Sequence, residues 1–284
     1  MLSRIRKILE TTIDNYIASD SITRGAAIAF YSVTSLIPVL VIVIAIAGLA
    51  FGDEAARGAI VRELSELIGS DGAILIQGAI ESAYNSESTG LALIVGSIIL
   101  ALTLSGVFGE LQSALNAIWK VDDRAFSMSR MLRGRAVSMG LVIGLGFLLL
   151  ISLVIDAGVS ATSSYIDQHL RYGALILSVL NRATSFILSW ILFAAIYKVL
   201  PDKPLGWRDV VFGSFVTTIA IEGGKTLIGV YLGTSTAITS YGAAGALASV
   251  VLWVYYSAQI FLLGASFTKA CAVFDSPSPP GKAN

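Results

Sequence analysis

Two side chains of opposite charge, Glu222 and Lys225, lie inside a long apolar stretch of the chain, TIAIEGGKTLIGVY at residues 218–231. A spacing of three residues places both on nearly the same face of a helix, where they can form an ion pair. The intervening Gly223 and Gly224 lower local helix stability and permit the close approach of another backbone or of a ligand. This combination indicates a site for a polar or charged group within apolar surroundings.

Two interpretations of the pair remain open. The pair either neutralises itself and joins its helix to a neighbour, or it lines a polar pathway, because ionisable residues in apolar surroundings commonly mark solute sites. The two glycines would let the helix loosen, as helices do at the binding sites of transporters. Further polar residues could join the pathway, although each could instead form one hydrogen bond between helices: Glu110, Gln112, Asn116, Tyr255 and Gln259.

Covalent or metal-dependent chemistry has few candidate residues in this chain. There is one histidine, His169, and one cysteine, Cys271, so no His/Cys cluster has the spacing of metal ligands. The phosphate-binding pattern GxxxxGK followed by Ser or Thr does not occur. We therefore expect no enzymatic activity, no metal and no cofactor.

The composition places these residues in a membrane protein. Of the 284 residues, 55% are hydrophobic and 13% are charged, and the mean hydropathy is +0.80. Soluble domains carry about 25% charged residues. About 20 consecutive apolar residues span a bilayer as a helix. The sequence therefore predicts an all-α bundle of six membrane-spanning helices, at residues 27–51, 90–112, 136–158, 183–200, 210–232 and 243–267.

The distribution of charge predicts the orientation of this bundle. Most of the 19 Lys and Arg residues fall in the N-terminal segment, in the loops after the second and fourth spans, and near the C-terminus. Basic loops stay on the cytoplasmic side, so both termini are expected there. The first outer loop, residues 52–89, is acidic, and we expect two short helices in it, with Asp53 and Asp71 as their N-caps.

The remaining segments complete the predicted domain organisation. Residues 1–26 form a cytoplasmic segment in which Leu2, Ile5, Leu9, Ile13 and Tyr16 recur at helical spacing. This amphipathic helix lies either on the membrane surface or against the protein's own loops. Residues 27–270 form the membrane domain, and the Pro/Ser-rich tail, residues 271–284, is expected to be disordered.

Two features of the spans concern packing. A series of small residues with a spacing of four predicts close helix packing, within one molecule or in a homo-oligomer: Ala101, Ser105, Gly109, Ser113 and Ala117. Pro38 removes a backbone donor within the first span and predicts a kink or opening near residues 34–38. This kink serves either as a hinge or only to shape the helix.

Several long blocks together resemble the YihY/BrkB family of bacterial inner-membrane proteins, long labelled ribonuclease BN. The resemblance covers roughly residues 20–270, and it rests on RGAAIAFYSVTSLIPVL, LSGVFGELQSALNAIWKV, YKVLPDKPLGWRDVVFGSF and SYGAAGALASVVLWVYYSAQIFLLGA. It implies a multi-pass protein of the bacterial cytoplasmic membrane, associated with envelope integrity, serum resistance or virulence, and with movement of lipids or other solutes. It supplies no catalytic residues to carry over.

Three functions follow as hypotheses. The first is binding or movement of a lipid or amphipathic solute, with membrane lipids as partners. The second is a non-transporting scaffold for envelope integrity that binds partners through its acidic outer helices. The remote third is a ribonuclease, which the short predicted cytoplasmic loops and the lack of metal ligands disfavour. Anionic lipid headgroups explain the basic loops without any nucleic acid.

Overall fold

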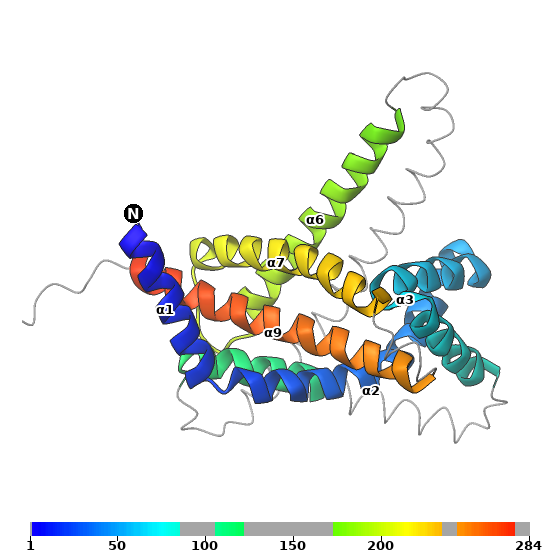
Figure 1. Ribbon diagram of the computed structural model, residues 1–284, viewed down its shortest axis with the longest axis horizontal. Coiled ribbons are helices and arrows are strands. Elements are labelled where there is room, and N and C mark those ends of the chain that lie inside the picture. The colour runs from blue at the N-terminus through cyan, green and yellow to red at the C-terminus, as the bar shows by residue number, and fades with distance from the viewer. Residues whose placement is uncertain (1, 86–105, 122–172, 235–242, 276–284) are drawn as a thin grey trace, which may run out of the picture.

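The computed structural model describes residues 2–85, 106–121, 173–234 and 243–275, and all statements on structure concern these ranges. They are helical and contain no strand, which confirms the predicted all-α class (Figure 1). The helices are α1 (Leu2–Ala18), α2 (Ser21–Phe51), α3 (Asp53–Asn85), α6 (Gly173–Val199), α7 (Trp207–Thr234) and α9 (Ala243–Asp275), together with residues 106–119.

Two stretches of the described helices are long and apolar enough to cross a membrane, Arg182–Val199 in α6 and Leu247–Phe274 in α9. They match the predicted fourth and sixth spans. The third predicted span, 136–158, lies outside the described residues, as do residues 90–105 of the second. The six-span topology and the cytoplasmic position of both termini therefore stay predictions.

Three predicted features of the helices differ from the structure. The outer loop forms one helix, α3, rather than two, so Asp71 lies inside a helix instead of capping one. α2 stays helical through Pro38, so it does not open there, and the proposed hinge stays a prediction. α9 continues to Asp275, so residues 271–275 of the expected disordered tail are helical. Residues 276–284 lie outside the described part.

Two faces of the N-terminal helix α1 have different surroundings. One face packs against α9 and buries Thr12. An adjacent face leaves Ile5, Leu9, Ile13 and Ile17 half exposed or more. α1 therefore packs on the protein, as one interpretation of its sequence expected, and still presents the apolar stripe that the membrane-surface interpretation requires.

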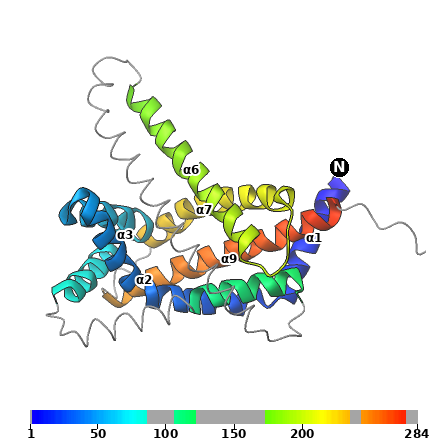
Figure 2. The same ribbon diagram turned by 180° about the vertical axis from the view of Figure 1, so that it is seen from behind.

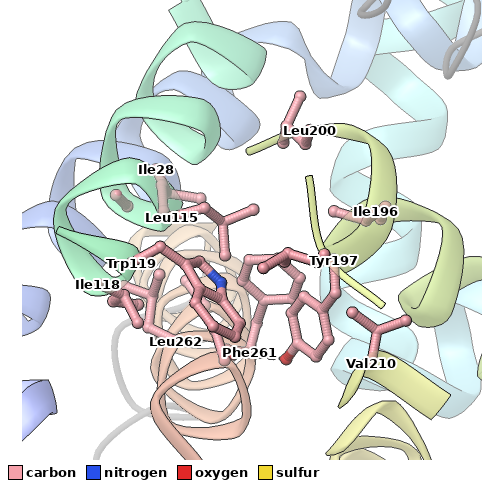
Figure 3. Packing of buried hydrophobic residues seen from close by; sticks show 14 of the residues in the cluster. Ile28, Leu115, Ile118, Trp119, Ile196, Tyr197, Leu200, Val210, Phe261 and Leu262 are labelled. Atoms are coloured by element: carbon pink, nitrogen blue, oxygen red, sulfur yellow. Dashed lines mark hydrogen bonds between the residues drawn. The ribbon is translucent and has the colours of Figure 1, made fainter. Parts of the chain in front are cut away.

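Two apolar clusters hold the ends of the bundle. The larger one joins helix 106–119 to α6, α7 and α9, and Figure 3 shows Trp119, Tyr197 and Phe261 side by side at its centre. The ring centroids of Tyr197 and Phe261 lie 5.0 Å apart. The smaller cluster joins α2, α3 and α9 around Ile44 and Val250. In Figures 1 and 2, α1 and α3 lie at opposite ends of the bundle.

Close approach between α7 and α9 depends on glycines in both helices. A side chain at Gly213 would lie 2.9 Å from the Thr268 Cα atom of α9, and one at Gly264 would lie 2.9 Å from the Thr217 Cβ atom of α7. By contrast, Gly109 of the predicted small-residue series faces open space. The predicted series is thus not confirmed at Gly109, and Ala101 and Ser105 lie outside the described residues, whereas glycines of α7 and α9 do allow close packing.

Gly213→Ala should destabilise the protein, because the new methyl group overlaps the Thr268 backbone and forces α7 away from α9. We expect a loss of about 1–3 kcal/mol, the usual cost of overpacking. Thermal unfolding of the purified protein in detergent micelles measures this loss.

The matched control is Gly223→Ala in the same helix, where the structure places nothing within 4 Å of the new methyl group. This substitution should leave stability unchanged or raise it by about 0.5–1 kcal/mol through helix propensity. Equal stability of the two variants would contradict the close α7–α9 packing.

Candidate functional site

The structure brings Glu222 and Lys225 together within α7. The Lys225 Nζ atom donates to Glu222 Oε1 at 2.9 Å, across one helical turn. Their side chains remain 36% and 37% exposed. No hydrogen bond from a second described helix reaches either side chain, so Glu222 Oε2 and the remaining N–H groups of Lys225 stay available to a ligand. The pair is therefore neutralised locally but not enclosed.

The two glycines beside the pair have different surroundings. Gly224 is buried, and a side chain there would lie 2.7 Å from the Tyr256 ring and 3.0 Å from Ile260. Gly223 is exposed and faces open space. α7 remains one helix from Trp207 to Thr234, so the expected loosening at these glycines is wrong. Close packing of Gly224 against α9 supports the helix at this point, and the open side is the one at Gly223.

The pair lies near the middle of the bundle. Glu222 follows Trp207 by 15 residues, which is about 22 Å along the helix axis. The neighbouring Gly224 packs against Tyr256, which lies in α9 between Val250 of the smaller apolar cluster and Ala258 of the larger one. The charged pair therefore lies between two apolar clusters.

The polar residues of helix 106–119 lie elsewhere. Gln112 Nε2 and Asn116 Nδ2 donate to the Asp202 carboxylate at 3.1 and 2.8 Å, and the Asp202 N–H donates to Asn116 Oδ1 at 2.8 Å. Asp202 lies in the turn between α6 and α7, before the first residue of α7. These contacts join helix 106–119 to that turn. The turn lies more than about 20 Å from Glu222 along the axis of α7.

Glu110 has a similar structural partner. Arg24 Nη1 lies 3.4 Å from Glu110 Oε1, donates to Ser113 Oγ at 2.8 Å, and so joins helix 106–119 to the start of α2. The Arg24 Nε–H donates to the Ser19 carbonyl at 3.0 Å. Glu110 therefore joins two helices in this structure and does not lie beside Glu222.

Gln259 joins α9 to the N-terminal helices. Its Nε2 donates to the Ile22 carbonyl at 3.1 Å, and its Oε1 accepts a short hydrogen bond from the Tyr16 hydroxyl. Burial, with a smaller contribution from Tyr255 nearby, raises the pKa of Tyr16 above its ordinary value. Tyr16 therefore stays protonated and able to donate. Gln259 also lies directly over Gly25, so this side chain faces α1 and α2 and not α7.

Several contacts at the same end of the bundle have no obvious sequence signal. Lys269 is buried to 9% exposure and donates to the Ile118 carbonyl at 2.6 Å, at the C-terminal end of helix 106–119. A cation is favourable there because the helix dipole is negative at that end. The sequence shows Arg24, Asp202 and Lys269 only as charged residues near predicted loops, because long-range partners are not encoded by spacing along one helix.

Metal ligation has no support among the described ranges, where no three His, Cys, Asp or Glu side chains gather closely enough to hold an ion. His169 lies outside these ranges. The partly exposed ion pair of α7 is an arrangement that can bind a polar group.

A family profile described as virulence factor BrkB matches residues 12–282. The chain belongs to the BrkB virulence-factor family. Similar proteins include UPF0761 membrane proteins of Ralstonia nicotianae, 31% identical over 87% of this chain, and of Klebsiella pneumoniae strain MGH 78578, 31% identical over 68% of it. Another, of a Psychrobacter strain, is 23% identical over 94% of this chain.

This BrkB-family chain spans about half to just under two thirds of the length of these relatives, namely 55%, 64% and 48%. No solved structure matches it. The relatives' description as membrane proteins agrees with the two long apolar helices, so the chain is a helical membrane protein.

The contact between Asn116 and Asp202 should contribute measurably to stability, because it fixes the α6–α7 turn on helix 106–119. In a double-mutant cycle of Asn116→Ala and Asp202→Ala, we expect a coupling free energy of about 1 kcal/mol from thermal or denaturant unfolding.

An exposed pair within α3, Gln77 Nε2 to Glu81 Oε1 at 3.0 Å, provides the control cycle. Its coupling should be about 0.2–0.5 kcal/mol, as for other pairs four residues apart on a helix. A coupling for Asn116 and Asp202 no larger than that value would show that the turn does not depend on this contact.

Proposed function

We propose that this BrkB-family protein binds an amphipathic lipid or solute at the Glu222–Lys225 pair and moves its polar part along α7. The observation that carries the proposal is an ion pair at mid-bundle depth whose side chains are about one third exposed, with open space beside it at Gly223. No covalent step, metal or cofactor is part of this activity.

The energetic argument begins with the cost of charge in the membrane. One unpaired charge at the centre of a membrane helix costs about 2.5–3.5 kcal/mol on insertion scales. The pairing of Lys225 with Glu222 lowers this cost, but a partly exposed ion pair still favours polar surroundings over lipid tails. A polar headgroup beside the pair would supply such surroundings.

The geometry of the pair favours a headgroup with both charges. Lys225 offers donors to a phosphate, and Glu222 offers an acceptor to an amine, with the charged atoms 2.9 Å apart. A zwitterionic phospholipid headgroup carries this combination. Gly223 leaves room for it, while Tyr256 and Ile260 of α9 support the other side of the helix at Gly224.

The proposed location is the bacterial cytoplasmic membrane, with both termini in the cytoplasm and membrane lipids as partners. The separation of α1 and α3 at opposite ends of the bundle supports a sided protein of this kind (Figure 1). Homo-oligomer formation and a hinge role for Pro38 remain part of the hypothesis. Glu110, Gln112, Asn116 and Gln259 are then supporting residues that hold the helices in place, and Tyr255 lies near Tyr16.

Glu222→Gln and Lys225→Gln should each slow lipid movement by about tenfold or more, because each leaves one uncompensated charge at mid-depth. The double variant should move lipid faster than either single variant but more slowly than the unmodified protein. Transfer of phospholipids with fluorescent headgroups between the leaflets of liposomes containing the purified protein measures these rates.

Glu81→Gln on α3 is the control, since it also removes one carboxylate from a helical pair, one that is exposed and bonded within α3. Its rate should equal that of the unmodified protein. If the double variant retains the full rate per folded molecule, the pair has no role in lipid movement. A loss of stability alone would assign the pair to packing and favour the envelope scaffold.

A further inference from the structure

A second candidate site lies on the side of the bundle where α6 crosses α7. A groove with a volume of about 450 Å³ is lined by Trp190 of α6 and by five residues of the first turns of α7: Trp207, Arg208, Val211, Phe212 and Phe215. This volume is within the range of about 300–1,000 Å³ typical of small-molecule sites. Figures 1 and 2 show α6 extending away from the bundle beyond this crossing.

The aromatic wall of the groove is held in place by specific contacts. Trp190 Nε1 donates to the Val211 carbonyl at 3.0 Å. The Trp190 and Phe215 rings meet edge to face with centroids 5.3 Å apart, and Phe186 meets Phe215 in the same way at 5.6 Å. These contacts fix an apolar surface that is formed before any ligand arrives, which reduces the ordering cost of binding.

The charges near the groove lie at one end of it. Arg208 is exposed and makes no ion pair with a described carboxylate. The neighbouring Asp209 carboxylate accepts instead from the Gly206 N–H at 3.0 Å. Lys198 Nζ lies 5.6 Å from the centre of the Trp207 ring. Two cations, Arg208 and Lys198, and the Asp209 carboxylate therefore lie near the start of α7, while the groove extends about 12 Å along the helix to Phe215.

This pattern matches one class of ligand. A glycerophospholipid has an apolar chain and a phosphate at one end, and Arg binds phosphate through paired hydrogen bonds. Trp207, 61% exposed at the start of α7, has the character of a residue at the membrane interface. We propose that the α6–α7 groove binds an acyl chain of an anionic glycerophospholipid, with the phosphate bound by Arg208.

This site is separate from the Glu222–Lys225 pair. Arg208 precedes Glu222 by 14 residues, or about 21 Å along α7. The groove would hold a resident lipid whether or not the protein moves lipids, so its test measures binding and not transport. A failure of lipid movement therefore leaves this inference intact.

Quenching of tryptophan fluorescence tests the inference. The purified full chain in detergent micelles is titrated with phosphatidylglycerol or phosphatidylcholine carrying brominated acyl chains, which quench nearby tryptophans such as Trp190 and Trp207. Half-maximal quenching should need about fivefold less phosphatidylglycerol than phosphatidylcholine, as expected for one cation that binds an anionic headgroup.

Two variants address the two parts of the groove. Arg208→Gln should abolish the preference for phosphatidylglycerol. Val211→Phe should fill the groove without adding a tryptophan and raise the half-maximal concentration of both lipids, and because Val211 is exposed the larger side chain leaves the core intact. The matched controls are Lys203→Gln, which lies in the α6–α7 turn and over the Trp119 ring, and Ile187→Phe, on the exposed face of α6. Both should behave like the unmodified protein.

Three results would overturn the inference. The first is equal quenching by the two lipids in the unmodified protein. The second is full competition by glycerol phosphate, which would show that the anion binds without a chain. The third is quenching that depends on protein concentration rather than on the lipid, which would assign the groove to a second copy of the chain.

Discussion

The close approach of α7 and α9 is the constraint on which the other features of this molecule depend. Lipid tails offer no hydrophobic advantage to helix association, so the two helices must meet through atoms in direct contact. Gly213 and Gly264 allow this contact at one end, and Gly224 allows it beside Tyr256. Their positions fix the register of the two helices. In this register Glu222, Lys225 and Gly223 face away from the closest part of the α7–α9 contact.

The polar residues divide between two tasks. At one end of the bundle, Glu110, Asn116, Asp202, Gln259 and Lys269 find partners on other elements and hold the helices in register. Such contacts are satisfied, so they have little capacity left for a ligand. The Glu222–Lys225 pair bonds only within its own helix among the described residues, and it retains free donors and acceptors. This difference distinguishes a candidate site from a structural contact.

Much of the helical arrangement could be predicted from the sequence, because apolar runs and their spacing report local structure directly. The amphipathic α1 and the long α2, α6, α7 and α9 coincide with predicted helices. Boundaries were less predictable. Pro38 is accommodated within α2, and Asp71 lies within α3, because neither a proline nor a potential N-cap ends a helix whose apolar face is well packed. The same holds for Gly223 and Gly224 in α7, which Tyr256 and Ile260 support.

The sequence by itself determined that the chain is helical, apolar enough for a membrane, and able to pair Glu222 with Lys225, because these properties depend on composition and on spacing along one helix. Only the tertiary structure decided that Gln112 and Asn116 bind Asp202, that Gln259 faces Tyr16, and that Trp190 and Arg208 share a groove. These residues are far apart in the chain, and their proximity follows from how the helices cross, which no local pattern encodes.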